Sequence, residues 1–257
     1  MSDKNISYDN IDRYDRQMKL PAIGPEGQKK LSMSRVLVVG AGGLGSPVLQ
    51  YLAGAGVGTI GIVDTDTVSI TNLHRQVLHP ESHVGMNKAE SAAIILRKQN
   101  SSITINTHPF MLDNSNANEI ISCYDFIIDA VDNFETKFLI NRTCVYLKKA
   151  FCYAGVIQFH GQLMTYVPGQ GPCLRCIFED DPAPADVPKC SQVGVLGQVA
   201  GVIGCLEAIE AIKYITGAGQ LLIGRMLIFD GLSSTIRVAK FSHARVGCEV
   251  CNQFFKD

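Results

Sequence analysis

Short apolar runs alternate with longer mixed segments along the first half of the chain, a pattern typical of strands and helices that follow one another. The predicted strands are Arg35–Val39, Thr59–Val63, Ile103–His108 and Asp125–Ala130, and the predicted helices are Ser46–Ala55, Lys88–Gln99 and Ala117–Ser122. A chain that alternates in this way builds a parallel sheet with helices on its faces. The first half therefore predicts two strand–helix–strand units of an α/β fold.

The pattern changes in the second half, where strands follow one another more directly. Cys152–Val167 has the alternation of hairpin strands, and Leu227–Phe229 and Ser234–Phe241 predict two more. Strands joined by short turns run antiparallel. We therefore expect an antiparallel extension of the same sheet, so that the whole fold is doubly wound and mostly parallel with antiparallel strands at one side.

The most apolar stretch of the chain is Val193–Ile209, which contains Gln198, Glu207 and glycines at positions 194, 197, 201 and 204. Polar side chains and repeated glycines of this kind are unusual in a membrane-spanning helix. The stretch therefore predicts a buried helix or a pair of helical turns. Its glycines let another backbone approach, either inside the core or from a second subunit. By contrast, Glu179–Pro188 holds four acidic residues and three prolines among ten positions and predicts a mobile crossover loop.

Composition limits the classes of binding partner that we expect for this protein. The chain has 257 residues, of which 46% are hydrophobic, and a formal net charge of -1. Because nucleic-acid binding usually requires a clear basic excess, RNA or DNA is disfavoured as the main substrate. Met1–Asp12 is polar and acidic and lacks the apolar segment of an export signal, so we expect a cytoplasmic protein with no membrane attachment.

A glycine-rich loop, Gly40-Ala41-Gly42-Gly43-Leu44-Gly45, lies between the first predicted strand and its helix. Glycines in this position let backbone N–H groups approach a phosphate at a helix N-terminus. Asp64 ends the next strand about twenty positions on, where a carboxylate can bind ribose hydroxyls. The loop predicts a nucleotide site, and by itself it suits NAD as well as ATP.

Further charged residues favour phosphate chemistry over hydride transfer. Arg75 follows the second strand, Lys88 opens the next helix, and Asp132 follows the strand at Asp125–Ala130, where it could hold Mg²⁺. Arg16 lies in the N-terminal arm. Taken singly, each is more often a solvated surface charge. As a set beside a phosphate loop, they indicate a site that stabilises transferring phosphoryl groups by fixed charge, without an enzyme nucleophile or general base.

Two CxxC pairs, Cys173 with Cys176 and Cys248 with Cys251, predict a structural zinc site. Four thiolates complete a closed tetrahedron, whatever the length of chain between the pairs. The alternative is two thiol/disulfide pairs, but nine cysteines without an export signal suit a reducing compartment. Of the others, Cys190 follows Lys189 and is a candidate reactive thiol. The remainder, Cys123, Cys144, Cys152 and Cys205, are predicted small core residues.

At these motifs, together with Arg13-Tyr14-Asp15-Arg16-Gln17 and Asn72-Leu73-His74-Arg75-Gln76, the chain resembles the bacterial ubiquitin-activating-enzyme-like adenylyltransferases of thiamine and molybdopterin biosynthesis, the ThiF, MoeB and HesA type. The resemblance covers nearly the whole chain. It implies a Rossmann-like homodimer that uses ATP and Mg²⁺ to adenylate the C-terminal glycine carboxylate of a small ubiquitin-like sulfur carrier protein ending in Gly-Gly. It also implies a single domain over residues 1–257, with an arm at 1–34, a nucleotide-binding half at 35–150 and a zinc-bearing half at 151–257.

The resemblance also assigns roles to individual residues. Gly43 and Lys88 would bind phosphates, Asp64 the ribose and Asp132 the magnesium ion. Arg16 would reach into the neighbouring subunit's site, and Cys190 matches a loop cysteine that takes part in sulfur transfer in the thiamine branch. The remaining nucleotide-binding candidates are Gly40, Gly42, Thr71, Asn72, Leu73, His74, Arg75 and Asn133.

Two other functions stay open at this point. One is adenylation of another carboxylate, such as a peptide C-terminus, or action on a modified tRNA base. The other is an NAD-dependent oxidoreductase or a non-catalytic nucleotide-binding scaffold. Within the favoured function the carrier is undecided, although Leu52–Thr59 and Phe229–Gly231 lean to the thiamine branch. No fused sulfurtransferase is expected after Cys251, so a separate protein would donate the sulfur.

Overall fold

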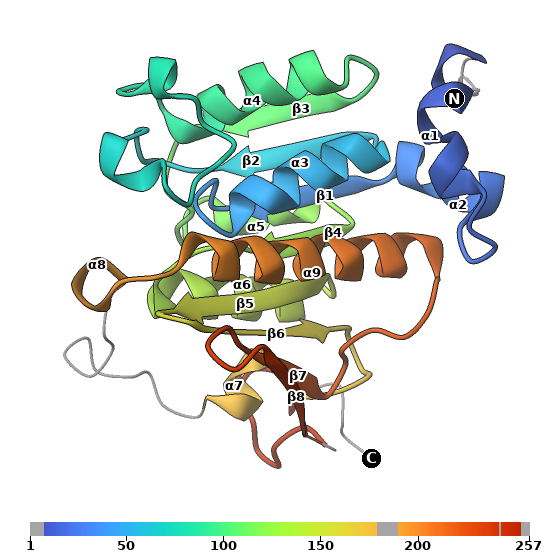
Figure 1. Ribbon diagram of the computed structural model, residues 1–257. Coiled ribbons are helices and arrows are strands. Elements are labelled where there is room, and N and C mark those ends of the chain that lie inside the picture. The colour runs from blue at the N-terminus through green and yellow to red at the C-terminus, as the bar shows by residue number, and fades with distance from the viewer. Residues whose placement is uncertain (1–7, 179–189, 242, 253–257) are drawn as a thin grey trace.

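The computed structural model describes residues 8–178, 190–241 and 243–252. Its centre is an eight-stranded sheet with the order β3-β2-β1-β4-β5-β6-β7-β8 (Figure 1). The strands are β1 (Arg35–Val39), β2 (Thr59–Val63), β3 (Thr104–His108), β4 (Phe126–Asp129), β5 (Ala150–Ile157), β6 (His160–Tyr166), β7 (Arg225–Asp230) and β8 (Thr235–Lys240). The strands β3, β2, β1, β4 and β5 pair in parallel, whereas β6, β7 and β8 pair antiparallel. The predicted parallel sheet with an antiparallel extension is confirmed.

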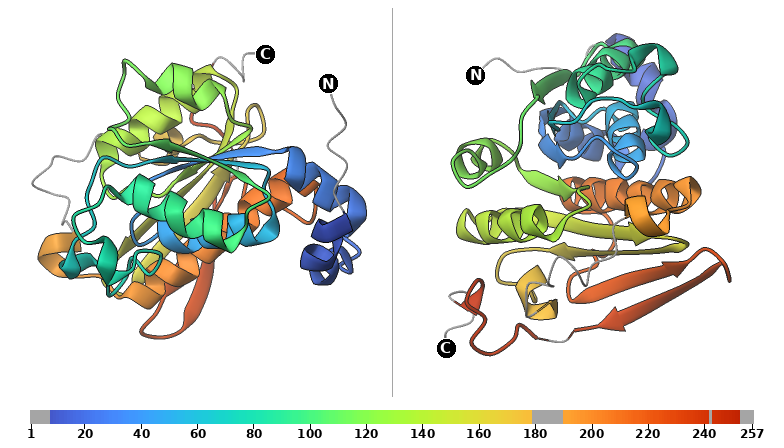
Figure 2. Two further views of the ribbon diagram at one scale, coloured as in Figure 1. Left: turned by 90° about the horizontal axis from the view of Figure 1, so that it is seen from above. Right: turned by 90° about the vertical axis from the view of Figure 1, so that its left-hand side faces the viewer.

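Helices cover both faces of this sheet. One face carries α3 (Gly45–Ala55), α4 (Lys88–Gln99) and α9 (Gly197–Thr216), and the other carries α5 (Ala117–Ser122) and α6 (Phe134–Tyr146), as the right-hand view of Figure 2 shows. Four further helical segments are short: η1 (Ile70–Asn72), η2 (Glu81–His83), α7 (Leu174–Ile177) and α8 (Cys190–Val193).

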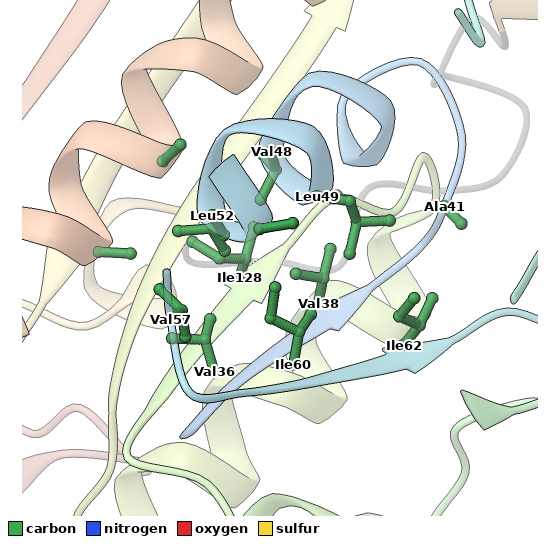
Figure 3. Packing of buried hydrophobic residues seen from close by; sticks show 14 of the residues in the cluster. Val36, Val38, Ala41, Val48, Leu49, Leu52, Val57, Ile60, Ile62 and Ile128 are labelled. Carbon is green, nitrogen blue, oxygen red and sulfur yellow. The ribbon is translucent and has the colours of Figure 1, made fainter. Parts of the chain in front are cut away.

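The central strands are mainly apolar because both of their faces are buried. In β1, Val36 and Val38 face the cluster beneath α3 and α9, whereas Leu37 and Val39 face the cluster beneath α5 and α6. Figure 3 shows Val36 and Val38 on the first side, below Leu49 of α3. This two-sided burial is why the run lacks the polar alternation of a half-exposed strand.

The N-terminal arm folds as two helices that the sequence analysis did not predict, α1 (Tyr8–Met18) and α2 (Gly24–Met33). They lie at the end of the sheet where the parallel strands begin (Figure 1). Two backbone hydrogen bonds fix them there, from Gly58 to the Leu31 carbonyl and from Thr59 to the Ser34 carbonyl. The arm is therefore part of the packed structure, at the edge of the sheet opposite to the carboxyl ends of the parallel strands.

The longest helix, α9, continues to Thr216, beyond the predicted end at Ile209. A Cβ at Gly204 would lie 2.5 Å from the Leu44 carbonyl oxygen, so this glycine lets α9 pack closely against the start of α3. The expectation of close packing inside the core is confirmed at this position. Among the described residues, no helix is both long enough and apolar enough to cross a bilayer. The predicted crossover loop at Glu179–Pro188 lies outside the described residues.

Candidate functional site

A cavity of about 840 Å³ opens at the carboxyl ends of β1, β2, β4 and β5. In open α/β sheets this edge is where ligands bind. The cavity brings together eight of the predicted nucleotide-binding residues: Gly40, Gly42, Gly43, Asp64, Arg75, Lys88, Asp132 and Asn133. Predicted residues up to 93 positions apart in the chain thus meet in one site, since Gly40 and Asn133 both line it.

The glycine loop has a conformation that side chains would block. Gly40 has a φ of 98°, and a Cβ on it would lie 2.7 Å from the Ala130 carbonyl oxygen. A Cβ on Gly45 would collide with the Gly40 carbonyl oxygen. These two positions require glycine so that the loop can turn tightly from β1 into α3. The turn leaves Gly42 and Gly43 on the cavity wall.

Asp64 braces this loop as well as lining the cavity. Its Oδ2 accepts a hydrogen bond from the Ala41 N–H at 2.7 Å, and its Oδ1 accepts one from the Asp66 N–H at 2.9 Å. Burial raises the pKa of the Asp64 carboxyl, and the Ala41 N–H bond acts in the opposite direction. A carboxylate held in this way can still accept from ribose hydroxyls at the cavity.

The two predicted cations both face the cavity, and each already has partners. Arg75 donates to the Asn72 Oδ1 at 3.0 Å and lies 2.8 Å from the His74 Nε2. Lys88 is only 4% exposed and pairs with the Asp66 carboxylate at 2.8 Å. Held cations of this kind are preorganised to stabilise an anion.

Several predicted site residues do not line the cavity. Among them are Thr71, Asn72, Leu73 and His74, and the side chains of Asn72 and His74 contact the Arg75 guanidinium. The contact expected between these four residues and a nucleotide stays a prediction. The side chain of Arg16 is 92% exposed on α1, at the far end of the sheet from the cavity (Figure 1). Cys190 begins α8, and its side chain lies outside the described residues.

Asp132 and Asn133 follow β4 and lead into α6. Asn133 caps this helix, because its side chain accepts a hydrogen bond from the Thr136 N–H at 2.9 Å. Asp132 is exposed at the cavity, and its carboxylate is the type of ligand that Mg²⁺ combines with substrate phosphates. The cap fixes the backbone beside Asp132, and with it the place from which the carboxylate projects.

A buried ion pair at the cavity floor was missed by the sequence analysis because α6 itself was not predicted. Lys137 of α6 donates to the Asp129 Oδ1 at 3.1 Å and to the Ala154 carbonyl at 2.6 Å. Its ammonium also lies 4.8 Å from the centre of the Tyr153 ring. Burial lowers the pKa of Lys137, but the Asp129 carboxylate more than offsets this, so the pKa is raised overall. The cavity therefore contains a third fixed cation.

Replacing Lys137 with methionine is expected to destabilise the protein by ~3–5 kcal/mol, because the fully buried Asp129 carboxylate would lose its partner charge. Urea unfolding measures this loss. The double variant Lys137→Met/Asp129→Asn should recover part of the stability, since no unpaired charge is left. Equal stability of the wild type and the single variant would contradict the ion pair.

The four predicted zinc ligands come together beside α6. The sulfur atoms of Cys173, Cys176, Cys248 and Cys251 all lie within 4.8 Å of one another. Cys173 and Cys248 are 3.8 Å apart, close to the ~3.8 Å between sulfurs on a tetrahedral zinc ion with bonds of about 2.3 Å. The Cys176 Sγ also accepts a hydrogen bond from the Arg245 N–H at 3.3 Å. The geometry and the all-sulfur donor set fit a closed structural zinc site, as the spacing predicted.

The match to known proteins agrees with this geometry. Residues 14–250 match the model of the ThiF family. The chain belongs to the ThiF family. The predicted resemblance is thereby confirmed over nearly the whole length.

Related ThiF-family proteins include two curated sequences that are each 48% identical to this chain. One is the adenylyltransferase and sulfurtransferase MOCS3-2 of Zea mays, for which the match covers 98% of this chain and 52% of the relative. The other is MOCS3 of Aedes aegypti, with 96% and 56% covered. The chain thus spans about half the length of these relatives. Among solved structures, E. coli MccB with ATP has a TM-score of 0.82 at 26% identity, covering 93% of this chain and 74% of MccB.

Proposed function

We propose that this ThiF-family protein is an adenylyltransferase that uses ATP to activate the C-terminal glycine of a ubiquitin-like sulfur carrier protein. The observation that carries the proposal is the single cavity in which the glycine loop, Asp64, two held cations and Asp132 converge. The names of the MOCS3 relatives, which describe adenylyltransferases, support the same activity.

The chemistry needs only what this cavity offers. A carboxylate oxygen of the carrier attacks the α-phosphorus of ATP, the bond from that phosphorus to the bridging oxygen breaks, and pyrophosphate leaves with the electron pair. The product is an acyl-adenylate. The incoming carboxylate is already ionised at pH 7, so no general base is required. The barrier comes from bringing anions together, and Arg75 and Lys88 would lower it by fixed positive charge.

Magnesium fits the same arrangement. Asp132 would hold the ion against the phosphate oxygens, where it would neutralise part of their charge. The glycine loop would receive the phosphates, and Asp64 would orient the ribose. Lys88 would exchange its contact with Asp66 for one with a phosphate.

Two alternatives receive less support. An NAD-dependent oxidoreductase leaves Arg75 and Lys88 without a function, since hydride transfer does not generate charge on a phosphate. Adenylation of a peptide C-terminus uses the same phosphate chemistry and differs only in the acyl substrate. The structural likeness to MccB, which has been solved together with forms of MccA, makes this the second candidate.

The proposal is tested by exchange of labelled pyrophosphate into ATP. Exchange should depend on magnesium and on an added carrier ending in Gly-Gly, and carriers of the thiamine and molybdopterin types should be compared side by side. A carrier lacking its last glycine is the matched control. Reduction of NAD without any pyrophosphate exchange would instead favour the oxidoreductase.

A homodimer would explain the position of Arg16. Arg16 lies at the far end of the sheet from its own cavity, so a role in the nucleotide site would require the cavity of another copy. The outer face of α9 supports such an assembly, since Val202 and Ile209 are 40% and 48% exposed there. Apolar side chains grouped on one face are typical of association surfaces.

Mixing two inactive variants tests this role of Arg16. Arg16→Ala and Asp132→Ala proteins, each inactive alone, should regain about a quarter of the wild-type exchange after random reassociation, because half of the dimers would contain one intact site. Exchange that stays at the sum of the two separate variants would rule out the contribution across subunits.

Cys190 is a separate proposal for the later sulfur step, which would consume the acyl-adenylate. Cys190→Ser is expected to keep pyrophosphate exchange while it lowers the yield of carrier thiocarboxylate when a sulfur-donor protein is present, because thiolate chemistry is lost at this position. Mass spectrometry of the carrier measures the yield. Cys123→Ser is the matched control, since Cys123 is exposed and its prediction as a core residue was wrong.

A further inference from the structure

Behind the glycine loop, three side chains form a hydrogen-bonded chain that ends on the loop backbone. His79 Nε2 lies 2.8 Å from the Ala41 carbonyl oxygen, and His79 Nδ1 lies 2.8 Å from the Ser91 Oγ. The same Oγ lies 2.8 Å from the His83 Nδ1. His79 is 4% exposed and Ser91 is fully buried, so water does not compete for these contacts.

The position of each proton along these hydrogen bonds follows from the last acceptor, the Ala41 carbonyl oxygen. A carbonyl oxygen can only accept, so the His79 Nε2 must carry the proton that it donates to Ala41. Burial lowers the pKa of His79, with the nearby Lys88 charge acting in the same direction, and the ring is neutral at pH 7. Its Nδ1 is then an acceptor and receives a hydrogen bond from the Ser91 hydroxyl. The Ser91 oxygen in turn accepts from a proton on the His83 Nδ1.

The last acceptor, the Ala41 carbonyl oxygen, belongs to the backbone of the glycine loop. The Ala41 N–H is held by the Asp64 carboxylate at 2.7 Å, and the Ala41 carbonyl is held by His79. Gly40, Gly42 and Gly43 line the cavity, but Ala41 between them is fully buried and does not. The carbonyl is thus turned away from the place where anionic phosphates would lie.

We infer that His79 is a positioning residue for the nucleotide: it fixes the Ala41 carbonyl so that the glycine loop meets phosphate oxygens without a backbone acceptor among them. Ser91 and His83 hold His79 in the tautomer that this requires. With the opposite tautomer, the unprotonated Nε2 would face the carbonyl oxygen, and two acceptors would repel each other.

This inference rests on the proposed ATP site, and two separate measurements test it. The first is nitrogen NMR of the full chain carrying ¹⁵N-labelled histidine, at neutral pH and without nucleotide. His79 should show a protonated Nε2 and His83 a protonated Nδ1. In Ser91→Ala, where the two rings no longer share a hydroxyl, they should no longer be held in these opposite tautomers. Because no nucleotide is involved, the result is independent of the proposed function. A protonated Nδ1 on His79 in the wild type would overturn the inference.

The second measurement is the KM for ATP in carrier-dependent pyrophosphate exchange. His79→Leu should raise this KM roughly ten-fold with a much smaller change in kcat, the size expected from losing one buried hydrogen bond. His79→Gln can donate to the same carbonyl and should restore most of the affinity. His108→Gln alters a histidine bonded to Tyr124, outside the cavity wall, and should leave the KM unchanged.

The outcomes separate the possible failures. An unchanged KM in a folded His79→Leu protein would contradict the positioning role. If His79→Leu does not fold, Ser91→Ala carries the comparison, because it removes the hydroxyl that holds the His79 ring, and a wild-type KM for Ser91→Ala would also contradict the positioning role. Absence of exchange in the wild type would instead refute the proposed function, while the tautomers would still be decided by NMR.

Discussion

Asp132→Ala is expected to lower carrier-dependent pyrophosphate exchange by a factor of ~100 or more, as the loss of one preorganised group that stabilises transition-state charge typically does. Asp132 faces the cavity at the end of β4 and is exposed, so its removal should not disturb the core. The free energy of unfolding should therefore stay within about 0.5 kcal/mol of the wild type. A loss of exchange without a loss of stability would identify a functional carboxylate.

Glu135→Ala is the matched control for this experiment. Glu135 is an exposed carboxylate three residues further on, in the first turn of α6, and it does not line the cavity. It should keep nearly full exchange. If Asp132→Ala retained wild-type exchange across a magnesium titration, another residue would have to hold the metal.

Cys248→Ser is expected to have the largest effect on stability. Cys248 is fully buried within the group of four sulfurs, and its loss would leave a bound ion with an incomplete set of ligands. Loss of a structural metal commonly costs about 4 kcal/mol or more, which for a chain of this size lowers the melting temperature by roughly 10 °C. Calorimetry and the zinc content of the purified variant give the two readouts.

Cys205→Ser separates metal loss from a simple cysteine effect. Cys205 lies on α9, away from the four sulfurs, and is partly exposed. Its replacement should change neither the zinc content nor the melting temperature by much. A chelator should lower the stability of the wild type toward that of Cys248→Ser. Equal zinc content in Cys248→Ser and wild-type protein would contradict the assignment.

The strands could be predicted from sequence because their environment is simple. A strand buried on both faces, such as β1, is a short apolar run bounded by turn residues, and this pattern can be recognised in the sequence. The same logic failed for α6. Nine of its thirteen residues are buried, among them the polar Thr136, Lys137 and Asn141, so the helix shows no apolar stripe.

Some residues of the candidate site could likewise be predicted from the sequence, and others could not. Gly40, Asp64 and Asp132 follow strands whose carboxyl ends meet, so the topology alone places them together. Sequence proximity does not decide which residues of 71–76 line the cavity: because a turn points its side chains in different directions, Arg75 and Gln76 reach the wall and residues 71–74 do not. His79 and Lys137 became visible only through contacts with distant backbone atoms at Ala41 and Ala154.

The zinc cluster has a mechanical consequence for the segment that follows it. Cys176 anchors the chain just before residues 179–189, and beyond them the Gln158 N–H bond to the Gly194 carbonyl joins the chain to the rim of the cavity beside Val195. The chain is thus held on both sides of residues 179–189, by the cysteine cluster before them and by the Gln158–Gly194 backbone hydrogen bond after them. Loss of a bound ion would release the first of these two attachments and leave the second in place.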